Sequence, residues 1–154
     1  MIAKEKLNIL WSLEQTAEKY ADRVAVSDVN QELTWKELVK KAQVIGAELS
    51  EKVQPGNPVP VLLEKSSETL AVMLGIVYAG CFYVPVNPMN PTERLRKIME
   101  KLEPEVIISD EKGKEQLAAV GIGLEEKVIG PETLLATTGT DLSEEQRSKL
   151  EQIQ

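Results

Sequence analysis

The chain has 154 residues, and its 18 Lys and Arg against 25 Asp and Glu leave a formal net charge of −7. Hydrophobic residues make up 42% and charged residues 28%, which predicts one globular domain with a core and excludes a disordered tail. An acidic chain without a block of Lys or Arg is a poor candidate for binding nucleic acid or an anionic membrane surface.

Two residue types restrict the chemistry further. Histidine is absent, which excludes Ser-His and Cys-His nucleophile pairs and removes the commonest metal ligand. Cys81 is the only cysteine, so no internal disulfide is possible, as is usual in a reducing compartment. Residues 1–10 have no signal-peptide pattern, and we therefore expect a cytoplasmic location.

The first third of the chain predicts a helix, an antiparallel hairpin and a second helix. Four apolar residues recur at helical intervals in the first helix: Leu10, Leu13, Ala17 and Tyr20. The segments 23–27 and 32–35 flank a turn and predict the hairpin. Thr34 and Glu37 then match a capping box, which predicts a helix over residues 35–50.

A βαβ unit follows. The apolar segments 59–63 and 82–86 predict two strands that are buried on both faces, joined by a helix over residues 68–78 that Ser66 or Ser67 caps and Gly80 ends. Residues 69–92 carry no charge, but the apolar part is shorter than a membrane span and is interrupted by Gly75 and Pro85. We expect no membrane-spanning segment.

The rest of the chain continues the alternation. Asn90 is expected to cap a helix that runs to Leu102, and a strand is expected over residues 106–109. Asp110 is expected to cap a helix over residues 111–120, before a short strand at 127–130. The predicted fold is α/β, with a mostly parallel sheet, helices on both faces and a short antiparallel hairpin near the N-terminus. Residues 1–130 form the predicted subdomain, and 131–154 a linker with an exposed helix capped by Ser143.

Several short motifs suggest chemistry, but each has a simpler structural interpretation. Thr137–Thr140 is similar to a phosphate-binding loop, yet Asp141 follows where a Lys is needed. Gly121-Ile122-Gly123 is an incomplete dinucleotide motif and predicts a surface turn. Ser109 and Lys112 match a Ser-x-x-Lys pattern without its companion motifs.

The other candidate groups have ordinary structural explanations. Cys81 lies in an apolar segment, where a thiol stays protonated. The acidic pairs Glu125-Glu126 and Glu144-Glu145 have polar surroundings, which is typical of solvated surface. We predict no catalytic, cofactor-binding or metal-binding residue in this chain.

The βαβ unit nevertheless carries a family pattern. Residues 77–88 read Val-Tyr-Ala-Gly-Cys-Phe-Tyr-Val-Pro-Val-Asn-Pro, and residues 33–38 read Leu-Thr-Trp-Lys-Glu-Leu. In this order and spacing they resemble two core motifs of adenylate-forming (AMP-binding) enzymes. The resemblance is closest to adenylation domains of nonribosomal peptide synthetases and D-alanine–carrier protein ligases, with acyl-CoA synthetases as neighbours. Tyr78, Trp35 and Asn87 depart from the usual Lys, Tyr and Asp.

This resemblance implies the N-terminal part of a larger ligase. Such enzymes use ATP and Mg²⁺ to join a carboxylate to AMP, then transfer the acyl group to a carrier-protein thiol or to CoA. The phosphate loop, the adenine, ribose and Mg²⁺ segments and the catalytic Lys of the family are expected beyond Gln154. We therefore expect the chain alone to be inactive and to need the remainder of the adenylation domain.

Two alternatives remain open. The chain could be a standalone interaction module or one half of a split ligase, which a stop codon directly after Gln154 would favour. It could also be an unrelated doubly wound nucleotide-binding domain, which predicts ATP or AMP affinity in the chain itself. An apolar face left exposed where a missing subdomain docks would allow two copies to form a homodimer.

Overall fold

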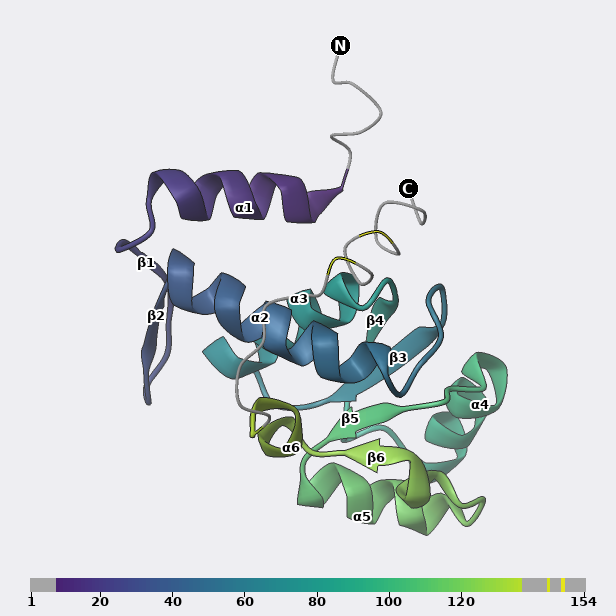
Figure 1. The fold of residues 1–154 in the computed structure, drawn as a ribbon. Coiled ribbons are helices and arrows are strands. Elements are labelled where there is room, and N and C mark those ends of the chain that lie inside the picture. The colour runs from purple at the N-terminus through teal and green to yellow at the C-terminus, as the bar shows by residue number, and fades with distance from the viewer. Residues whose placement is uncertain (1–7, 137–143, 145–147, 149–154) are drawn as a thin grey trace.

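The computed structural model describes residues 8–136 together with Glu144 and Ser148. Its strands are β1 (Val24–Ser27), β2 (Glu32–Thr34), β3 (Pro58–Leu62), β4 (Phe82–Pro85), β5 (Ile107–Ser109) and β6 (Val128–Ile129). Its helices are α1 (Ile9–Lys19), α2 (Trp35–Ser50), α3 (Ser67–Tyr78), α4 (Thr92–Leu102), α5 (Glu111–Val120), the 3-10 helix η2 (Leu124–Lys127) and α6 (Pro131–Leu135). Figure 1 shows this order along the ribbon.

The predicted α/β fold is confirmed. A four-stranded parallel sheet has the order β4-β3-β5-β6, and β1 and β2 form a separate antiparallel pair. The chain passes from β3 to β4 on one side of β3, and then returns through α4 to β5 on the other side. This reversal of strand order is the feature of a doubly wound sheet.

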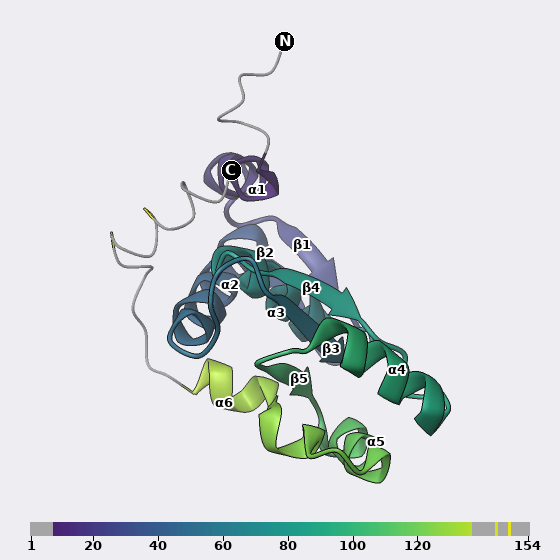
Figure 2. The same cartoon turned by 90° about the vertical axis from the view of Figure 1, so that its right-hand side faces the viewer.

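Side chains alternate between the two faces of the central strands and so form two cores. Val61 of β3 and Ile108 of β5 pack in the core beneath α2 and α3. Leu62 and Ile107, one position away on the same strands, pack in the second core beneath α4 and α5. Figure 2 shows these helix pairs on opposite sides of the sheet. The expected helices on both faces are thus confirmed.

The capping box of α2 is confirmed in detail. The Glu37 N–H donates to the Thr34 hydroxyl oxygen at 3.2 Å, and the Thr34 N–H donates to Glu37 Oε1 at 3.1 Å. The two hydrogen bonds satisfy N–H groups that have no partner within the helix. They fix the start of α2, the helix that packs most extensively against α3.

Helices α2 and α3 approach each other closely because glycines lie at their crossing. A Cβ at Gly46 would lie 2.5 Å from Tyr78 Cβ and 2.9 Å from the Gly75 carbonyl oxygen. A Cβ at Gly75 would lie 2.5 Å from Ile45 Cγ2. Neither position has room for a side chain, so one face of α3 is fully occupied by α2.

Strand β4 corrects one prediction. Residues 82–86 were expected to be buried on both faces, but β4 is an edge strand, and Phe82 and Tyr83 are 51% and 42% exposed. Only Val86, just after the strand, is buried. The apolar sequence matches that of a central strand, but no neighbouring strand lies beyond β4 in the part of the chain that the structure describes.

Two helix ends test the start and stop residues that the sequence predicted. Gly80 has φ +78° and follows the C-cap Ala79 of α3, as expected of a glycine that ends a helix. The cap of α4 differs from the prediction, since Pro91 and not Asn90 is the N-cap and no side chain caps this end. The ψ angle of Pro91 is 145°, which is extended and not helical, so the helix begins one residue later, at Thr92.

Residues 131–135 form α6, which begins at the predicted linker. Its Pro131 and Leu134 are buried, and α6 packs against α2. The start of the expected linker therefore adds to the core. The cap predicted at Ser143 lies outside the described residues. Within the described ranges, no helix has the length and apolar character needed to cross a bilayer.

Candidate functional site

The Ser-x-x-Lys residues are not brought together into a reactive pair. Ser109 is buried, and the carbonyl oxygens of Leu62 at 3.3 Å and Asp110 at 3.0 Å both lie within reach of its single hydroxyl hydrogen. Lys112 is exposed on α5. Asp110 caps α5 by accepting a hydrogen bond from the Gly113 N–H at 2.8 Å. The hydrogen bonds of Ser109 and Asp110 hold β3, β5 and the start of α5 together, so these two residues have a structural role.

The glycine motif lies in a surface turn. Gly121 and Gly123 both have φ +77°, so they end α5 and begin η2, and Ile122 between them is 45% exposed. Glu125 and Glu126 follow on η2. The phosphate-loop-like segment 137–141 and residue 145 lie outside the described residues, and Glu144 is exposed.

Cys81 is a packing residue in this structure. Its side chain is 7% exposed, and its thiol donates to the Gln54 carbonyl oxygen at 3.4 Å. Burial raises the pKa of the Cys81 thiol. The protonated form is therefore favoured further, and a protonated thiol is a weak nucleophile.

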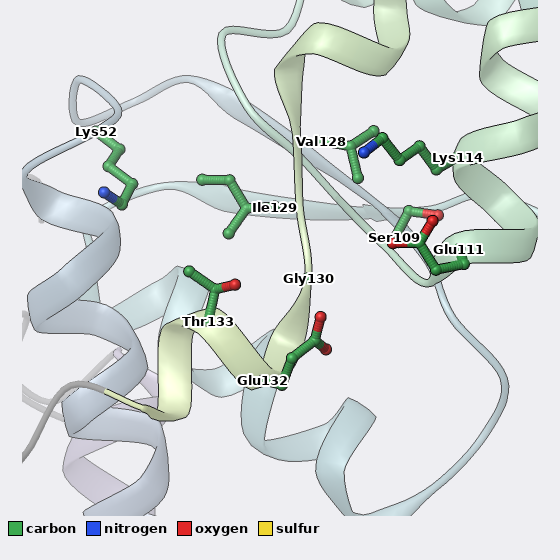
Figure 3. A pocket seen from close by; sticks show the side chains of 9 residues that line it. All are labelled: Lys52, Ser109, Glu111, Lys114, Val128, Ile129, Gly130, Glu132 and Thr133. Atoms are coloured by element: carbon green, nitrogen blue, oxygen red, sulfur yellow. The ribbon is translucent and has the colours of Figure 1, made fainter.

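A hollow of about 290 Å³ opens near the carboxyl ends of β5 and β6 (Figure 3). Its lining residues come from β5, α5, β6 and α6 and from the segments that follow α2 and β6: Lys52, Ser109, Glu111, Lys114, Val128, Ile129, Gly130, Glu132 and Thr133. Lys52 and Lys114 lie on opposite sides of it in Figure 3, and two glutamates balance their charge. No convergent set of like groups is formed. Of the two Ser-x-x-Lys residues, Ser109 lines this hollow and Lys112 does not.

The N-terminus of α3 is occupied by a carboxylate from the hairpin. Asp28 accepts hydrogen bonds from the Ser67 N–H at 2.7 Å, the Asn30 N–H at 2.7 Å and the Gln31 N–H at 2.9 Å. These bonds, that from Ser67 first, hold the pKa of the Asp28 carboxyl well below its usual range. A helix N-terminus often binds a phosphate or another anion, but here Asp28 takes that place.

The clearest candidate for an interaction surface lies on α3 and β4. We call it the α3–β4 surface, and it consists of Leu70, Met73, Leu74, Val77 and Tyr83. The four α3 residues have the spacing of one helix face. Leu70 is 37% exposed, and the other three are half-buried; of these, Leu74 and Val77 also pack against the core beneath α2 and α3. Helix α3 contacts β4 beside it. The sequence suggested an exposed apolar face but could not locate it, because the same reasoning assigned both elements to the interior.

The sequence is similar to proteins of known families. The sequence model of the AMP-binding enzyme family matches residues 13–153. Bacitracin synthase 1 of Bacillus licheniformis is 37% identical over 122 residues, which cover 76% of this chain and 2% of that protein. The chain therefore spans a small part of this curated relative.

Solved structures share the fold. The nonribosomal peptide synthetase FmoA3 (S1046A), in its AMPPNP-bound form, matches with a TM-score of 0.73 and 26% identity, over 86% of this chain and 14% of that one. The N-terminal subdomain of Klebsiella oxytoca NpsA, in complex with 3-hydroxybenzoyl-AMSN, matches with a TM-score of 0.72 and 23% identity. That match covers 86% of this chain but 32% of the NpsA subdomain.

Proposed function

Because the chain belongs to the family of AMP-binding enzymes, we propose that it forms the first part of a ligase domain that activates an amino acid or another carboxylic acid. In the proposed reaction the substrate carboxylate attacks the α-phosphorus of ATP, and pyrophosphate leaves. A carrier-protein thiol, or the thiol of CoA, then attacks the acyl carbon of the acyl-AMP, and AMP leaves. The family match over residues 13–153 is the observation that carries this proposal.

The relatives support amino acids as the first substrate class to test. FmoA3 is a nonribosomal peptide synthetase by name, and it has been solved with the nucleotide analogue AMPPNP bound. We place the reaction in the cytoplasm, since Cys81 has no second cysteine in the sequence with which to form a disulfide.

We propose that the 154 residues have no activity by themselves. In their described part, no three acidic or thiol groups lie together as metal ligands. The N–H group of Ser67, at the start of α3, already donates to Asp28. The remainder of the AMP-binding domain would then supply the nucleotide and metal ligands.

The test is ATP–pyrophosphate exchange across a panel of amino acids and other carboxylic acids. We expect no exchange above the blank with the 154-residue chain. We expect exchange with one or a few acids when the polypeptide encoded downstream of Gln154 is joined to it. Exchange by the short chain would contradict its inactivity, and no exchange by the longer protein with any acid would contradict the proposed reaction.

A split ligase or an interaction module is the second candidate, and the exposed α3–β4 surface favours it over an isolated domain. The reading frame after Gln154 separates these possibilities from a continuous ligase. Titration calorimetry with ATP and AMP tests the third candidate, an unrelated nucleotide-binding domain. Binding of either nucleotide to the short chain would support that candidate and contradict ours.

A further inference from the structure

We infer that the α3–β4 surface is where the remainder of the same AMP-binding domain docks onto this part of the chain. The inference rests on the proposed function for the identity of the partner. It rests on the structure for the location and for the chemistry, which is apolar and uncharged.

Helix α3 is apolar on nearly all of its surface. Glu68 is the one charged residue among its twelve, and residues 69–78 contain none. The face toward α2 and the sheet is buried: Ala71, Val72, Gly75, Ile76 and Tyr78. The remaining face of α3 is not polar. It carries an apolar stripe that consists of the four α3 residues of the α3–β4 surface. A helix that is apolar all around is typical of a position buried on all sides.

Strand β4, beside α3, adds an exposed aromatic side chain to this apolar surface. Tyr83 is an exposed aromatic residue on the edge strand. Val84 packs in the core beneath α4 and α5, so alternation places the Tyr83 side chain on the α3 side of the sheet. The apolar surface therefore continues from the helix onto the strand that contacts it.

The backbone of β4 indicates how the partner docks. Phe82 and Val86 donate their N–H groups toward β3, to the carbonyl oxygens of Asn57 and Val61. Backbone N–H directions alternate along a strand, so the backbone nitrogen atoms of Tyr83 and Pro85 point away from β3 and toward the free edge. Proline has no N–H group, so the free edge is poorly suited to a continuous ladder with another strand. The docking is therefore through side chains packed over α3 and Tyr83.

The identity of the partner follows from size. This chain covers 32% of the NpsA N-terminal subdomain, so a subdomain of that size contains about twice as much polypeptide again outside the matched part. A second copy of the chain could also cover an apolar stripe. The all-around apolar helix favours the rest of the domain, because permanent burial and not reversible association is what such a helix needs.

The experiment is a binding titration between the 154-residue chain and the polypeptide encoded directly downstream of Gln154, expressed separately. We expect a one-to-one complex. The double variant Leu70→Glu/Tyr83→Glu is expected to bind about tenfold more weakly or worse, as for a central apolar anchor. Ile122→Glu is the matched control, since Ile122 is also apolar and 45% exposed but lies in the turn after α5. It should bind like the parent chain.

Each outcome decides the inference. Equal binding by parent and double variant, binding lost equally in the control, or absence of a complex would overturn it. A homodimer of the short chain that the double variant dissociates would assign the surface to a second copy and overturn it as well. Circular dichroism of each variant shows whether it is folded, and Leu70→Gln/Tyr83→Gln replaces a variant that is not. A complex without ATP–pyrophosphate exchange would leave this inference standing and contradict the proposed function.

Discussion

Helices α3 and α4 are both crossovers of the same parallel sheet, but they are built differently. Helix α4 has six charged residues among its eleven, and its buried residues are confined to Leu95 and Met99. Helix α3 has one charged residue among twelve and an apolar outer stripe. Helix α4 is therefore complete as a water-facing helix, whereas α3 has the composition of a helix that is covered on both sides.

This difference has an energetic meaning. Each Å² of apolar surface removed from water contributes about 25 cal/mol before the costs of association, so covering the stripe and Tyr83 would favour an assembly. Large apolar patches are rare on proteins that work alone. The comparison thus indicates that the apolar surface that is not yet covered lies on α3 and not on α4.

The largest expected effect separates the two faces of α3. Ile76→Ala on its buried face should lower the free energy of unfolding by about 2–5 kcal/mol, because it leaves a cavity against the sheet. Leu70→Ala on the outer stripe should change it by only about 0.5 kcal/mol. Urea unfolding of the isolated chain measures both. Equal losses would mean that the outer stripe is already part of the core, and the comparison with α4 would fail.

The contact of α3 with α2 gives the next effect. In a helix, Gly to Ala ordinarily gains about 1 kcal/mol. Gly46→Ala should instead lose about 1–3 kcal/mol, since the added Cβ would meet Tyr78 Cβ and the Gly75 carbonyl oxygen. The sign of the change in urea midpoint is the readout. A gain in stability would show that α2 and α3 can separate without cost.

The start of α2 provides a smaller effect. Thr34→Ala removes one acceptor of the capping box and should cost about 1 kcal/mol. Thr34→Ser keeps the hydroxyl and is the matched control, which should unfold within a few tenths of a kcal/mol of the parent. Thermal unfolding followed by circular dichroism is sufficient. An unchanged midpoint in Thr34→Ala would mean that packing on α3 alone holds α2.

The smallest effect concerns the N-terminus of α3 and depends on pH. The pKa of Asp28 is lowered by folding, so its contribution to stability is complete above the ordinary value of 3.8. It is lost as the pH falls through the lower pKa of the folded state. Asp28→Asn should therefore be less stable than the parent at pH 7, and the difference should close as the pH falls below about 4.

Urea midpoints of the two proteins at several pH values measure this difference. Glu32→Gln, in the same hairpin, is the control and should show no comparable closing. A gap between Asp28→Asn and the parent that stays constant down to pH 2 would show that the hydrogen bonds from Ser67, Asn30 and Gln31 do not depend on the charge of the carboxylate.

Local signals in the sequence predicted much of the fold, because they arise from the backbone itself. The capping box at Thr34 and Glu37 and the helix end at Gly80 depend on residues next to each other in the chain, and both are confirmed. The predicted cap of α4 was wrong: Pro91 takes an extended ψ of 145° and becomes the N-cap in place of Asn90, and nothing in the local sequence marks this shift of one residue.

The exposure of β4 could not be predicted in the same way. Phe82 and Tyr83 have the composition of buried residues, and whether they are covered depends on polypeptide that packs from outside the described chain. The same holds for the outer stripe of α3. The hollow near β5 and β6 joins side chains that are far apart in the sequence, from Lys52 to Thr133, and no local pattern marks it.

The most direct test of the central claim is hydroxyl-radical footprinting of the 154-residue chain with and without the polypeptide encoded downstream of Gln154. Met73 and Tyr83 report on the α3–β4 surface, and Ile122 is the internal control. We expect oxidation of Met73 and Tyr83 to fall several-fold in the mixture while that of Ile122 is unchanged. Unchanged oxidation of Met73 and Tyr83, with a complex formed, would contradict the account.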